Sequence, residues 1–477
     1  MPLHGILTIA GNQIEAEIHY ATVHSMWIML DRDLTFGDVE NLVLRIGSEN
    51  LEIGPCHADS TGELGRGMIR LIPFKVIFDL KELFFKARVN TMDTGLFNLP
   101  PMLSYKKNIA PAFRRFVSDL AYDLNTYLVY LDQLDAQSAD EPQLVRDTIQ
   151  ANILQDMGKA FRDCLDSCSL ELDMHAADLS PTELGTYCHY FRRQIWNLLL
   201  RSPFLVRSNL KPRGYQGDSE MMQMIYHNDY QGDSTFGKLL HKYSVDQPAA
   251  QAVRNRRHEI AAMLDARLTR GHFHKGQKLR VLSVACGPAI EIQDILHNLK
   301  TCAAIHVSLL DQDQKALMEA ADMIGRVEKK LGATISVEYL QQSVRTLQTS
   351  HQLQDSWGHF DFIYSMGLFD YLNAVIAKTI VNCLFALLNP GGEIIIGNMA
   401  MGNPSLRFME FWHDWKIIHR TESDMLAMGK DLPNAELSLQ YDQTGIQMML
   451  HIKKPTEIAL LQLAPPLKGK ISCHKVA

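Results

Sequence analysis

Short apolar runs, each followed by an amphipathic segment, dominate the C-terminal part of the sequence. The run 281–284 predicts a buried parallel strand, and it passes through small residues at 285–289 into an amphipathic helix that begins at Glu291. Further strands are predicted at 305–310, 336–340, 360–364 and 392–396, and an antiparallel pair at 437–441 and 447–452. The pattern predicts an α/β domain over residues 275–455, built on a seven-stranded, mostly parallel sheet.

The first 90 residues follow a different pattern, in which apolar and polar positions alternate between turn residues. The alternating runs lie at 5–10, 15–21, 26–31, 41–47, 51–56 and 66–74. Short strands at such regular spacing are typical of sandwiches and barrels. We therefore expect a small β-barrel over residues 1–90.

Between these two parts the period changes to that of helices. Apolar residues recur every three or four positions in 111–134 and 145–175, with a polar break at 135–141. Ser180-Pro181 predicts the start of another helix with Pro at its first position. We interpret residues 91–204 as a helical bundle that links barrel and core and offers a surface for a homodimer. Residues 205–274 are expected to form a helical cap, and residues 456–477 a short, basic, loose tail.

The charge and cysteine content narrow the classes of function. The chain has 47 Lys and Arg against 54 Asp and Glu, a net charge of -7, which gives no general attraction to nucleic acid or an anionic membrane. Its eight cysteines form no C-x-x-C pair and no paired framework, so neither a metal site nor disulfides are expected. No apolar run reaches about 18 residues, so we expect no stable membrane insertion and predict a cytoplasmic protein.

The turn after the strand 281–284 gives the first indication of chemistry. Ala285, Cys286 and Gly287 are small, which lets the backbone approach a ligand at the carboxyl end of the strand. Only one of the three is glycine, so the G-x-G-x-x-G pattern of dinucleotide sites is absent. Asp311 directly follows the next strand, roughly 20 residues on, where such folds place an acid that binds ribose hydroxyls. The turn and the acid together predict a nucleoside site.

Four motifs of the core carry a resemblance to class I S-adenosylmethionine-dependent methyltransferases, which have a Rossmann-like α/β fold: VLSVACGPAIE, LLDQD, DFIYSMGLFDYL and LLNPGGEIIIGN. More narrowly, KPRGYQGDSEMMQMIY, QPAAQAVRNRR, SMGLFDYL and GNMAMGNPSLRFMEFWHDWKIIHRT are similar to the bacterial family described as extracellular-factor, 3-hydroxypalmitic acid methyl ester biosynthesis proteins. This resemblance covers residues 205–420. It implies S-adenosylmethionine as the cofactor, a 3-hydroxy fatty acid or related acyl compound as the substrate, and a methyl ester used as a quorum-sensing signal.

The same resemblance implies which residues hold the cofactor. Most class I enzymes carry an acid at the position of Ser283 and further glycines at those of Ala285 and Ala289, so this turn departs from the common form. Asp311 is expected to bind the ribose, and residues 342–344 the adenine edge. The expected cofactor residues are Ser283, Ala285, Cys286, Gly287, Asp311, Gln312, Ser343, Val344, Ser365, Met366, Gly367 and Arg256.

Residues 365–371 follow the strand 360–364, at the edge of the sheet where the transferred methyl group is expected. A carboxylate acceptor is already ionised near neutral pH and needs no base. We therefore expect Asp370, Tyr371 and Tyr215 to shape the site and orient the acceptor. For a hydroxyl or amine acceptor, His241 or Asp370 would be the candidate base.

The loop 213–220, which two glycines interrupt, runs into a predicted helix at 221–226. It is a candidate cover for the active site, with the methionines of the helix as a pliable apolar lining. The alternative is that Asp218 and Glu220 cap the helix while the methionines pack in the core.

Two further stretches beside the core allow two interpretations each. A helix predicted from Gln247-Pro248 carries four polar donors at 254–257, which usually form a solvated face. Within them, Arg256 is predicted to bind a carboxylate, either of the cofactor or of the substrate. An aromatic set with helical spacing either lines an apolar channel for an acyl chain or packs in the core. Its members are Phe408, Phe411, Trp412 and Trp415.

The N-terminal barrel resembles PilZ domains, which bind cyclic diguanylate, in the spacing of its predicted strands and turns. Their ligand motif needs an arginine pair followed by an Asp/Asn-x-Ser-x-x-Gly run, and residues 56–62 resemble only its second part. Without the arginines a cyclic dinucleotide would lack charge-assisted partners, so packing or pairing with a partner is the favoured role. Two other functions stay open for the chain: methylation of another small molecule through oxygen or nitrogen, and a regulatory protein that senses ligands without turnover.

Overall fold

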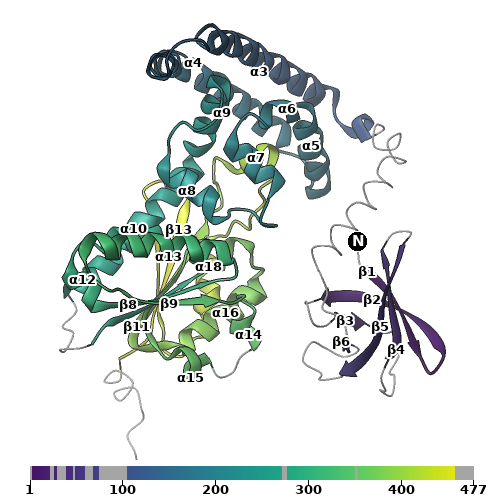
Figure 1. Ribbon diagram of the computed structural model, residues 1–477, viewed down its shortest axis with the longest axis vertical. Coiled ribbons are helices and arrows are strands. Elements are labelled where there is room, and N and C mark those ends of the chain that lie inside the picture. Colours follow the sequence, from purple (N-terminus) through teal and green to yellow (C-terminus); the bar gives the residue numbers. More distant parts are fainter. Residues whose placement is uncertain are drawn as a thin grey trace, which may run out of the picture. The chain divides into compact units, whose positions relative to one another are not determined.

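The chain folds into two units in the computed structural model, Met1–Ile109 and Ala110–Ala477 (Figure 1). Each unit has hydrophobic clusters of its own. The structure describes residues 3–21, 26–29, 39–46, 49–59, 68–74, 105–270, 277–349 and 353–456.

The first unit, as far as it is described, contains a closed antiparallel barrel of six strands in the order β1-β2-β3-β6-β5-β4. The strands are β1 (Leu3–Ile9), β2 (Asn12–Ala21), β3 (Met26–Met29), β4 (Val39–Ile46), β5 (Glu49–Asp59) and β6 (Met68–Pro73), and a 3-10 helix η1 (Tyr105–Asn108) follows later. Leu7, Ile28, Leu42 and Leu71 are buried inside the barrel. The predicted small barrel is confirmed. Its likeness to PilZ domains stays a prediction, and residues 60–62 of the compared motif lie outside the described residues.

The second unit begins with helices, as the periodicity predicted. They are α3 (Pro111–Gln137), α4 (Gln143–Ala176), α5 (Pro181–Gln194), α6 (Trp196–Leu199) and α7 (Pro203–Leu210). In α3 the buried residues Phe113, Val117, Leu120 and Leu124 are three or four positions apart, which places them on one face. Ser180 caps α5: its hydroxyl accepts from the Glu183 N–H, and the Glu183 side chain accepts from the Ser180 N–H.

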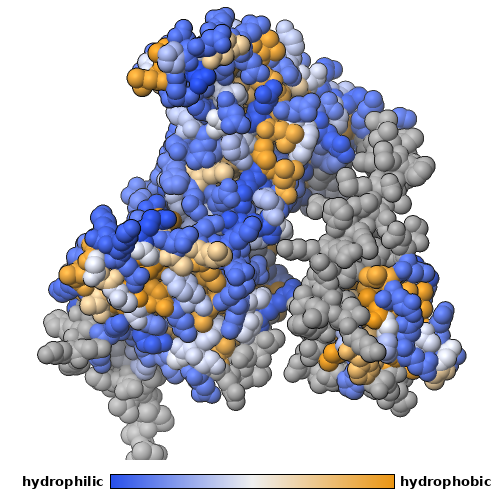
Figure 2. All heavy atoms as spheres, viewed as in Figure 1, coloured by the Kyte–Doolittle hydropathy of each residue, from blue (hydrophilic) through white to orange (hydrophobic). Residues whose placement is uncertain are grey.

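The long helices α3 and α4 also expose apolar side chains. Tyr122, Val129, Leu144, Leu170 and Met174 are each more than half exposed. Figure 2 shows hydrophobic side chains in separate groups on a largely hydrophilic face of this unit. The homodimer surface therefore stays a prediction. Throughout the described residues, none of the helices combines the length and the apolar character that a membrane span requires.

Residues 277–349 and 353–456 build a seven-stranded sheet in the order β12-β13-β11-β10-β7-β8-β9. The strands are β7 (Leu279–Val284), β8 (Ile305–Asp311), β9 (Ser336–Gln341), β10 (Phe360–Ser365), β11 (Leu388–Met399), β12 (Glu436–Tyr441) and β13 (Gln447–Lys453). Within this described sheet, β13 is the strand that runs antiparallel to both neighbours, and the other pairs are parallel. The mostly parallel sheet and the terminal antiparallel pair are confirmed.

The strand β11 starts earlier than predicted, at Leu388 rather than Gly392. Phe360 pairs with Leu388 and Phe362 with Glu393, so residues 389–392 lie opposite Asp361 alone. The Asn-Pro-Gly-Gly segment, which predicts a turn, is therefore accommodated as an irregularity inside the strand.

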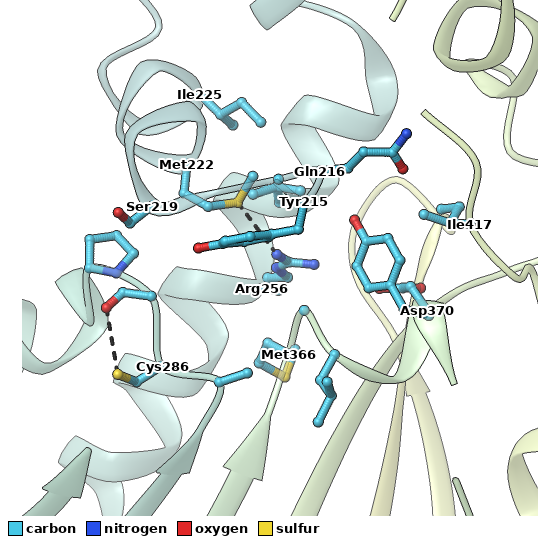
Figure 3. A pocket seen from close by; sticks show the side chains of 18 of the residues that line it. Tyr215, Gln216, Ser219, Met222, Ile225, Arg256, Cys286, Met366, Asp370 and Ile417 are labelled. Carbon is cyan, nitrogen blue, oxygen red and sulfur yellow. Dashed lines mark hydrogen bonds between the residues drawn. The ribbon is translucent and has the colours of Figure 1, made fainter. Parts of the chain in front are cut away.

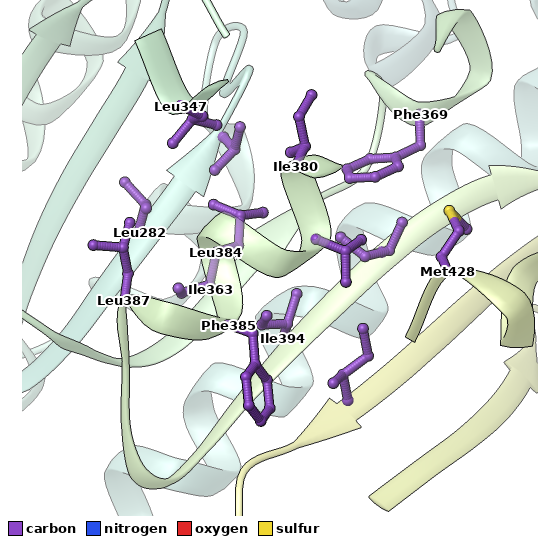
Figure 4. Close-up of a cluster of buried hydrophobic side chains, with 14 of the residues drawn as sticks. Leu282, Leu347, Ile363, Phe369, Ile380, Leu384, Phe385, Leu387, Ile394 and Met428 are labelled. Carbon is purple, nitrogen blue, oxygen red and sulfur yellow. The ribbon is translucent and has the colours of Figure 1, made fainter. Parts of the chain in front are cut away.

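Helices cover both faces of the sheet, which explains why its strands appear as continuous apolar runs. On one face, α10 (Pro248–Arg270), α11 (Ile290–Ile295) and α13 (Gln314–Leu331) pack against side chains that include Val281. On the other face, α14 (Thr346–Thr349), α15 (Leu353–Trp357), α16 (Ala374–Ala386) and α18 (Glu422–Gly429) pack against a cluster that includes Leu282 and Ile363 (Figure 4). Consecutive residues of β7 thus belong to opposite layers.

The strand order reverses between β7 and β10. After β7 the chain first adds β8 and β9 on one side of it, and then returns to the other side of β7 to add β10, followed outward by β11 and β13. Open sheets of this kind bind ligands beyond the carboxyl ends of the strands at such a reversal. The remaining elements are α8 (Ser219–His227), α9 (Thr235–Val245), α12 (Leu299–Ala304), η2 (Phe369–Tyr371) and α17 (Leu406–Trp412). An apolar cluster joins α8 and α10 to the segment after β11 through Met222, Val253 and Met409.

Candidate functional site

A cavity of about 660 Å³ lies at the carboxyl ends of β7, β8, β9 and β10. Its wall combines these strand ends with the loop before α8, the helices α8 and α10, and the segment that follows β11. Every predicted site residue lines this cavity except Ser365 and His241. Folding therefore assembles one site from parts of the sequence that are far apart.

The turn after β7 has an unusual backbone. Ala285, Gly287 and Ala289 have φ angles of 54°, 55° and 49°, all in the left-handed region. For an L-residue with a side chain, this conformation costs about 1–2 kcal/mol. Positions 285 and 289 are those where most class I methyltransferases carry glycine. The alanines keep the glycine-type backbone, and strain of this kind is typical of functional sites.

Asp311 ends β8 directly beside this turn. Its Oδ2 accepts a 2.9 Å hydrogen bond from the Gly287 N–H, and its Oδ1 accepts one of 2.9 Å from the Asp313 N–H. Burial raises the pKa of Asp311, and these two N–H donors oppose that effect. An ionised carboxylate offers about four lone-pair positions, so each oxygen can accept one further donor. The geometry suits two adjacent hydroxyl groups, such as those of a ribose.

Residues 342–344 follow β9 and also line the cavity. The side-chain Oε1 of Gln342 is buried and has no hydrogen-bond partner among the described residues. An unpaired buried acceptor costs about 1–3 kcal/mol. Because this oxygen is fully enclosed, the Gln342 side chain has to rotate toward the cavity before Oε1 can accept from a ligand donor such as the amino group of an adenine. With Asp311 for the ribose, these residues fit the adenosine part of S-adenosylmethionine.

Glu291 and Tyr364 form a buried pair in the cavity wall, and a site role was predicted for neither of them. The Tyr364 hydroxyl donates a 2.7 Å hydrogen bond to Glu291 Oε1, and burial raises the pKa of Glu291. A site role for Glu291 could have been predicted from the sequence, because Glu291 is an acid in the first turn of the helix after the small-residue turn. For Tyr364 the sequence offers no such feature beyond its position in a strand.

Ser365, the next residue of β10, corrects one prediction. It was expected among the cofactor residues, but it is fully buried and does not line the cavity. Its hydroxyl donates a 3.0 Å hydrogen bond to the Val284 carbonyl, which ties β10 to β7. Successive side chains of a strand point to opposite faces, so Tyr364 and Ser365 cannot both face the same space.

The guanidinium of Arg256 is buried in the cavity wall. Its Nη1 donates to Gln447 Oε1 at 3.3 Å, and its Nη2 lies 3.8 Å from the Met222 sulfur (Figure 3). In the described part of the chain, no carboxylate forms an ion pair with it. A buried guanidinium without a carboxylate partner can bind an anion strongly.

The other donors of the 254–257 motif have partners within the protein, so this stretch is not a plain solvated face. Arg254 donates to the carbonyls of Ile225 and Val245, at 3.0 and 2.7 Å. Arg257 binds Asp294 through two hydrogen bonds of 2.7 Å. Arg256 is thus set apart from its neighbours in sequence by facing the cavity without an ionic partner.

The loop before α8 is fastened to the start of α13. Arg213 donates to Asp313 at 2.9 Å and to Glu319 at 2.6 Å, and the Tyr215 hydroxyl donates to Asp313 at 2.7 Å. Burial and Asp313 raise the pKa of Tyr215 above its usual value. Asp218 caps α8 by accepting a 3.0 Å hydrogen bond from the Met221 N–H. Each interpretation of the loop holds in part: the loop lines the cavity and Asp218 caps the helix, whereas Glu220 pairs with Arg207 at 2.7 Å and is not a cap.

The methionines and the aromatic set each divide between cavity and core. Met221 and Met222 both belong to the apolar cluster under α8, and of the two only Met222 also lines the cavity. Phe408 and Trp415 line the cavity, whereas Phe411 and Trp412 pack against Phe191 in the helical layer, with ring centroids 5.6 and 5.3 Å away.

Asp370 and Tyr371 lie on the η2 turn after β10. Asp370 Oδ1 accepts a 2.8 Å hydrogen bond from the Met399 N–H. Burial raises the pKa of Asp370 to about 6, although this N–H and the charges of Arg256 and Arg420 favour the ionised form. The Trp415 Nε1–H donates to the Tyr371 hydroxyl at 2.8 Å. Both polar side chains are therefore held by neighbours, which suits the shaping role predicted for them.

His241 corrects a second prediction. It is fully buried on α9, lies outside the cavity lining, and neither ring nitrogen has a partner among the described residues. Burial lowers its pKa to about 4. It does not reach the cavity, so it cannot act there as a base. The histidine that lines the described cavity is His413, which lies between Trp412 and Trp415 of the aromatic set and for which no role was predicted.

A comparison with known protein families agrees with this description. The family described as "Putative methyltransferase" matches residues 211–353, which contain the loop before α8, Arg256, the turn after β7, Asp311 and residues 342–344. This match supports a methyltransferase. None of the curated proteins matches the sequence.

Several solved structures are similar at low identity. A possible exported protein from Bordetella parapertussis is 16% identical, with a TM-score of 0.38, over 64% of this chain and 97% of that one. An O-methyltransferase family protein from Burkholderia thailandensis is 12% identical, with a TM-score of 0.36, over 76% and 98%. Magnesium protoporphyrin IX methyltransferase from Synechocystis PCC 6803 with bound SAH is 13% identical, with a TM-score of 0.32, over 43% and 86%. At these values the likeness carries no conclusion by itself.

Proposed function

We propose that this protein is an S-adenosylmethionine-dependent methyltransferase that acts on the carboxylate of an apolar acyl molecule. The observation that carries the proposal is that the lining of one cavity combines two sets of residues, one from the strand ends and one from α8, α10 and α17. Asp311, Gln342 and the turn 285–287 form a polar half suited to adenosine. Met222, Phe408 and other apolar side chains form the second half.

In the polar half the protein's own groups are arranged to bind and orient. Asp311 accepts from the ribose hydroxyls, Gln342 rotates toward the cavity so that its Oε1 accepts from the adenine amine, and the left-handed turn at Ala285 lets the backbone approach the cofactor. When bound, S-adenosylmethionine supplies a methyl group that bonds to an acceptor oxygen as its bond to sulfur breaks, leaving the neutral thioether. Orientation of this kind is the main contribution that such a site makes to an in-line displacement.

The second half of the cavity suits an acyl chain. Its lining includes Met222, Ile225, Val253, Phe408 and Met409. Apolar walls with a few placed polar groups are typical of sites for small apolar ligands. The motifs shared with the 3-hydroxypalmitic acid methyl ester family support a 3-hydroxy fatty acid as the specific substrate, with its methyl ester as the product.

Arg256 is the group that we assign to the acceptor carboxylate. Its neighbours are Gly367 after β10, Gln447 at the start of β13 and Met222 on α8, not the ends of β7 and β8 where adenosine is expected. A guanidinium binds both oxygens of a carboxylate and so orients it toward the methyl group. The acceptor is ionised near neutral pH, so no protein base is required.

The proposal is tested by calorimetric titration with S-adenosylmethionine, followed by incubation of the protein with labelled cofactor and 3-hydroxy fatty acids. Wild type is compared with Asp311→Ala, and with Asp322→Ala as a control, because Asp322 is an exposed carboxylate on α13. We expect Asp311→Ala alone to lose binding, and label to appear in a methyl ester. Binding without ester would leave a methyltransferase with another acceptor. Absence of binding in the wild type would overturn the proposal and favour a ligand sensor.

A further inference from the structure

His413 lies at the end of α17, in the apolar half of the cavity. Its ring packs edge-on against Phe204 and Phe408, with centroids 5.2 and 4.9 Å away. The residue is 98% buried, since its exposure is 2%. A polar ring enclosed by aromatic side chains needs a hydrogen-bond partner for each of its nitrogens.

One nitrogen of this ring has its partner within the protein. His413 Nδ1 lies 2.9 Å from the Ser208 hydroxyl, and that hydroxyl donates its hydrogen to the Leu205 carbonyl at 3.1 Å. With the single hydrogen of Ser208 on that carbonyl, the hydroxyl oxygen accepts from Nδ1–H. This arrangement favours the neutral tautomer that carries its proton on Nδ1 and has a lone pair on Nε2.

The second nitrogen has no partner in the described part of the chain, yet it is not sealed from the cavity. Nε2 of His413 makes no hydrogen bond there, and it is absent from the fully enclosed polar atoms that lack a partner. Both nitrogens of His241, by contrast, are fully enclosed. His413 lines the cavity, and Nε2 is its ring nitrogen that has neither a partner among the described residues nor full enclosure, so Nε2 is the atom available to a bound molecule. Burial lowers the pKa of His413 to about 3, so the ring is neutral at physiological pH.

We infer that His413 Nε2 accepts a hydrogen bond from a hydroxyl group of the acyl acceptor and so selects hydroxylated acyl molecules over unsubstituted ones. This inference rests on the proposed function, because it takes the apolar half of the cavity as the acceptor site. A hydroxyl donor satisfies Nε2, whereas an alkyl chain in the same place leaves a buried acceptor unpaired. The ring neighbours Phe204, Phe408 and Ser208 are uncharged, which suits a neutral donor.

His413 is a specificity-determining residue in this scheme, not a catalytic one. The nucleophile is the carboxylate held by Arg256, and no proton has to leave it. Ser208 acts through His413 as a positioning residue, since it fixes which nitrogen carries the proton. Loss of Ser208 should therefore weaken the selection less than loss of the imidazole.

The test measures binding rather than turnover. Protein saturated with S-adenosylhomocysteine is titrated in a calorimeter with dodecanoate, 2-hydroxydodecanoate and 3-hydroxydodecanoate. We expect the wild type to bind one of the hydroxylated acids about tenfold more tightly than dodecanoate, the scale of one buried hydrogen bond. His413→Phe should remove this preference without weakening dodecanoate binding, and Ser208→Ala should reduce it. His241→Phe is the matched histidine control and should keep the full preference.

His413→Asn provides a second variant in case the aromatic replacement disturbs packing, because its amide oxygen can still accept a hydrogen bond. Partial preference in His413→Asn and none in His413→Phe, with unchanged S-adenosylhomocysteine binding in both, would support the inference. A full preference in His413→Phe, equal binding of all three acids by the wild type, or binding of none of them would overturn it. Intact selection without methyl ester formation would overturn the proposed reaction alone.

Discussion

The Gly287 N–H and the Asp311 carboxylate meet across 2.9 Å, which joins the turn after β7 to the end of β8. A second bond of 3.1 Å, from the Cys286 N–H to the Leu310 carbonyl, holds the same two segments together. The acid is therefore oriented by the backbone before any ligand binds. Preorganisation of this kind reduces the ordering that binding would otherwise require.

Gln342→Met should stabilise the free protein and weaken cofactor binding at the same time. The substitution removes a buried acceptor without a partner, which costs about 1–3 kcal/mol, and with it the proposed contact to adenine. Thermal unfolding without ligand and calorimetry with S-adenosylmethionine measure the two effects. Gln341→Met, at an exposed neighbour, should change neither. A variant that loses stability would show that Gln342 has a structural partner instead.

Ala285→Gly should raise the free energy of unfolding by up to about 1 kcal/mol, because glycine adopts a φ of 54° without strain. Ala151→Gly, at an exposed position in the interior of α4, should lower it by about 1 kcal/mol. Denaturant unfolding of the two variants gives effects of opposite sign if the strain at the turn is real. The same sign in both would refute it.

Arg256→Gln should raise the KM for the acceptor acid at least about tenfold while the affinity for S-adenosylmethionine stays unchanged, because a charge-assisted contact to the acceptor is lost. Steady-state kinetics and calorimetry separate the two quantities. Arg270→Gln, exposed at the end of α10, is the control. If the variant instead loses cofactor affinity, the guanidinium binds the methionine carboxylate of the cofactor.

Gly217→Ala should lower methyl transfer more than Gly214→Ala. Both glycines have positive φ angles, 68° and 83°, so backbone strain is similar. A Cβ at position 217 would lie 2.8 Å from the Trp415 ring and 3.3 Å from the Tyr371 hydroxyl, whereas one at position 214 meets nothing within 4 Å. The difference in kcat/KM between the two variants measures the effect of the contact that the added Cβ at position 217 makes with Trp415 and Tyr371. Equal losses would show that strain in the loop, and not the cavity wall, limits activity.

Asp370→Asn should stabilise the protein more at pH 8 than at pH 4. The pKa of Asp370 is raised from 3.8 to about 6, so the folded state favours the protonated form, and its contribution to stability falls as the pH rises from about 4 to 6. A difference of about two pKa units corresponds to about 3 kcal/mol. Urea unfolding across this range measures the effect.

Asp442→Asn is the control of opposite sign. Although burial opposes it, hydrogen bonds from Thr444 and Asn255 lower the pKa of Asp442. Its stabilisation is present above a pH of about 4 and is lost below it, so the substitution should destabilise the protein mainly at neutral pH. A parallel pH dependence in both variants would contradict these assignments.

Local patterns in the sequence were sufficient to predict the strands, the helix starts and the polar half of the site. Hydrophobic runs indicate which segments are buried. A turn and an acid that follow neighbouring parallel strands must lie together at one edge of the sheet. For this reason it could be predicted from the sequence that Ala285, Gly287 and Asp311 lie together at one edge of the sheet. The same reasoning failed inside β11, where residues 389–392 look like a turn but are accommodated within the strand.

The direction of individual side chains depended on packing between segments far apart in sequence. Ser365 and Tyr364 face opposite sides of β10, and Phe408 and Phe411 divide between cavity and core. Likewise, His413 lines the cavity and His241 does not. Periodicity identifies the faces of an element but not which neighbour will cover each face. The polar half of the site is formed by residues that directly follow neighbouring parallel strands, so the local sequence pattern is sufficient to predict it. The apolar half forms only when α8, α10 and α17 pack together.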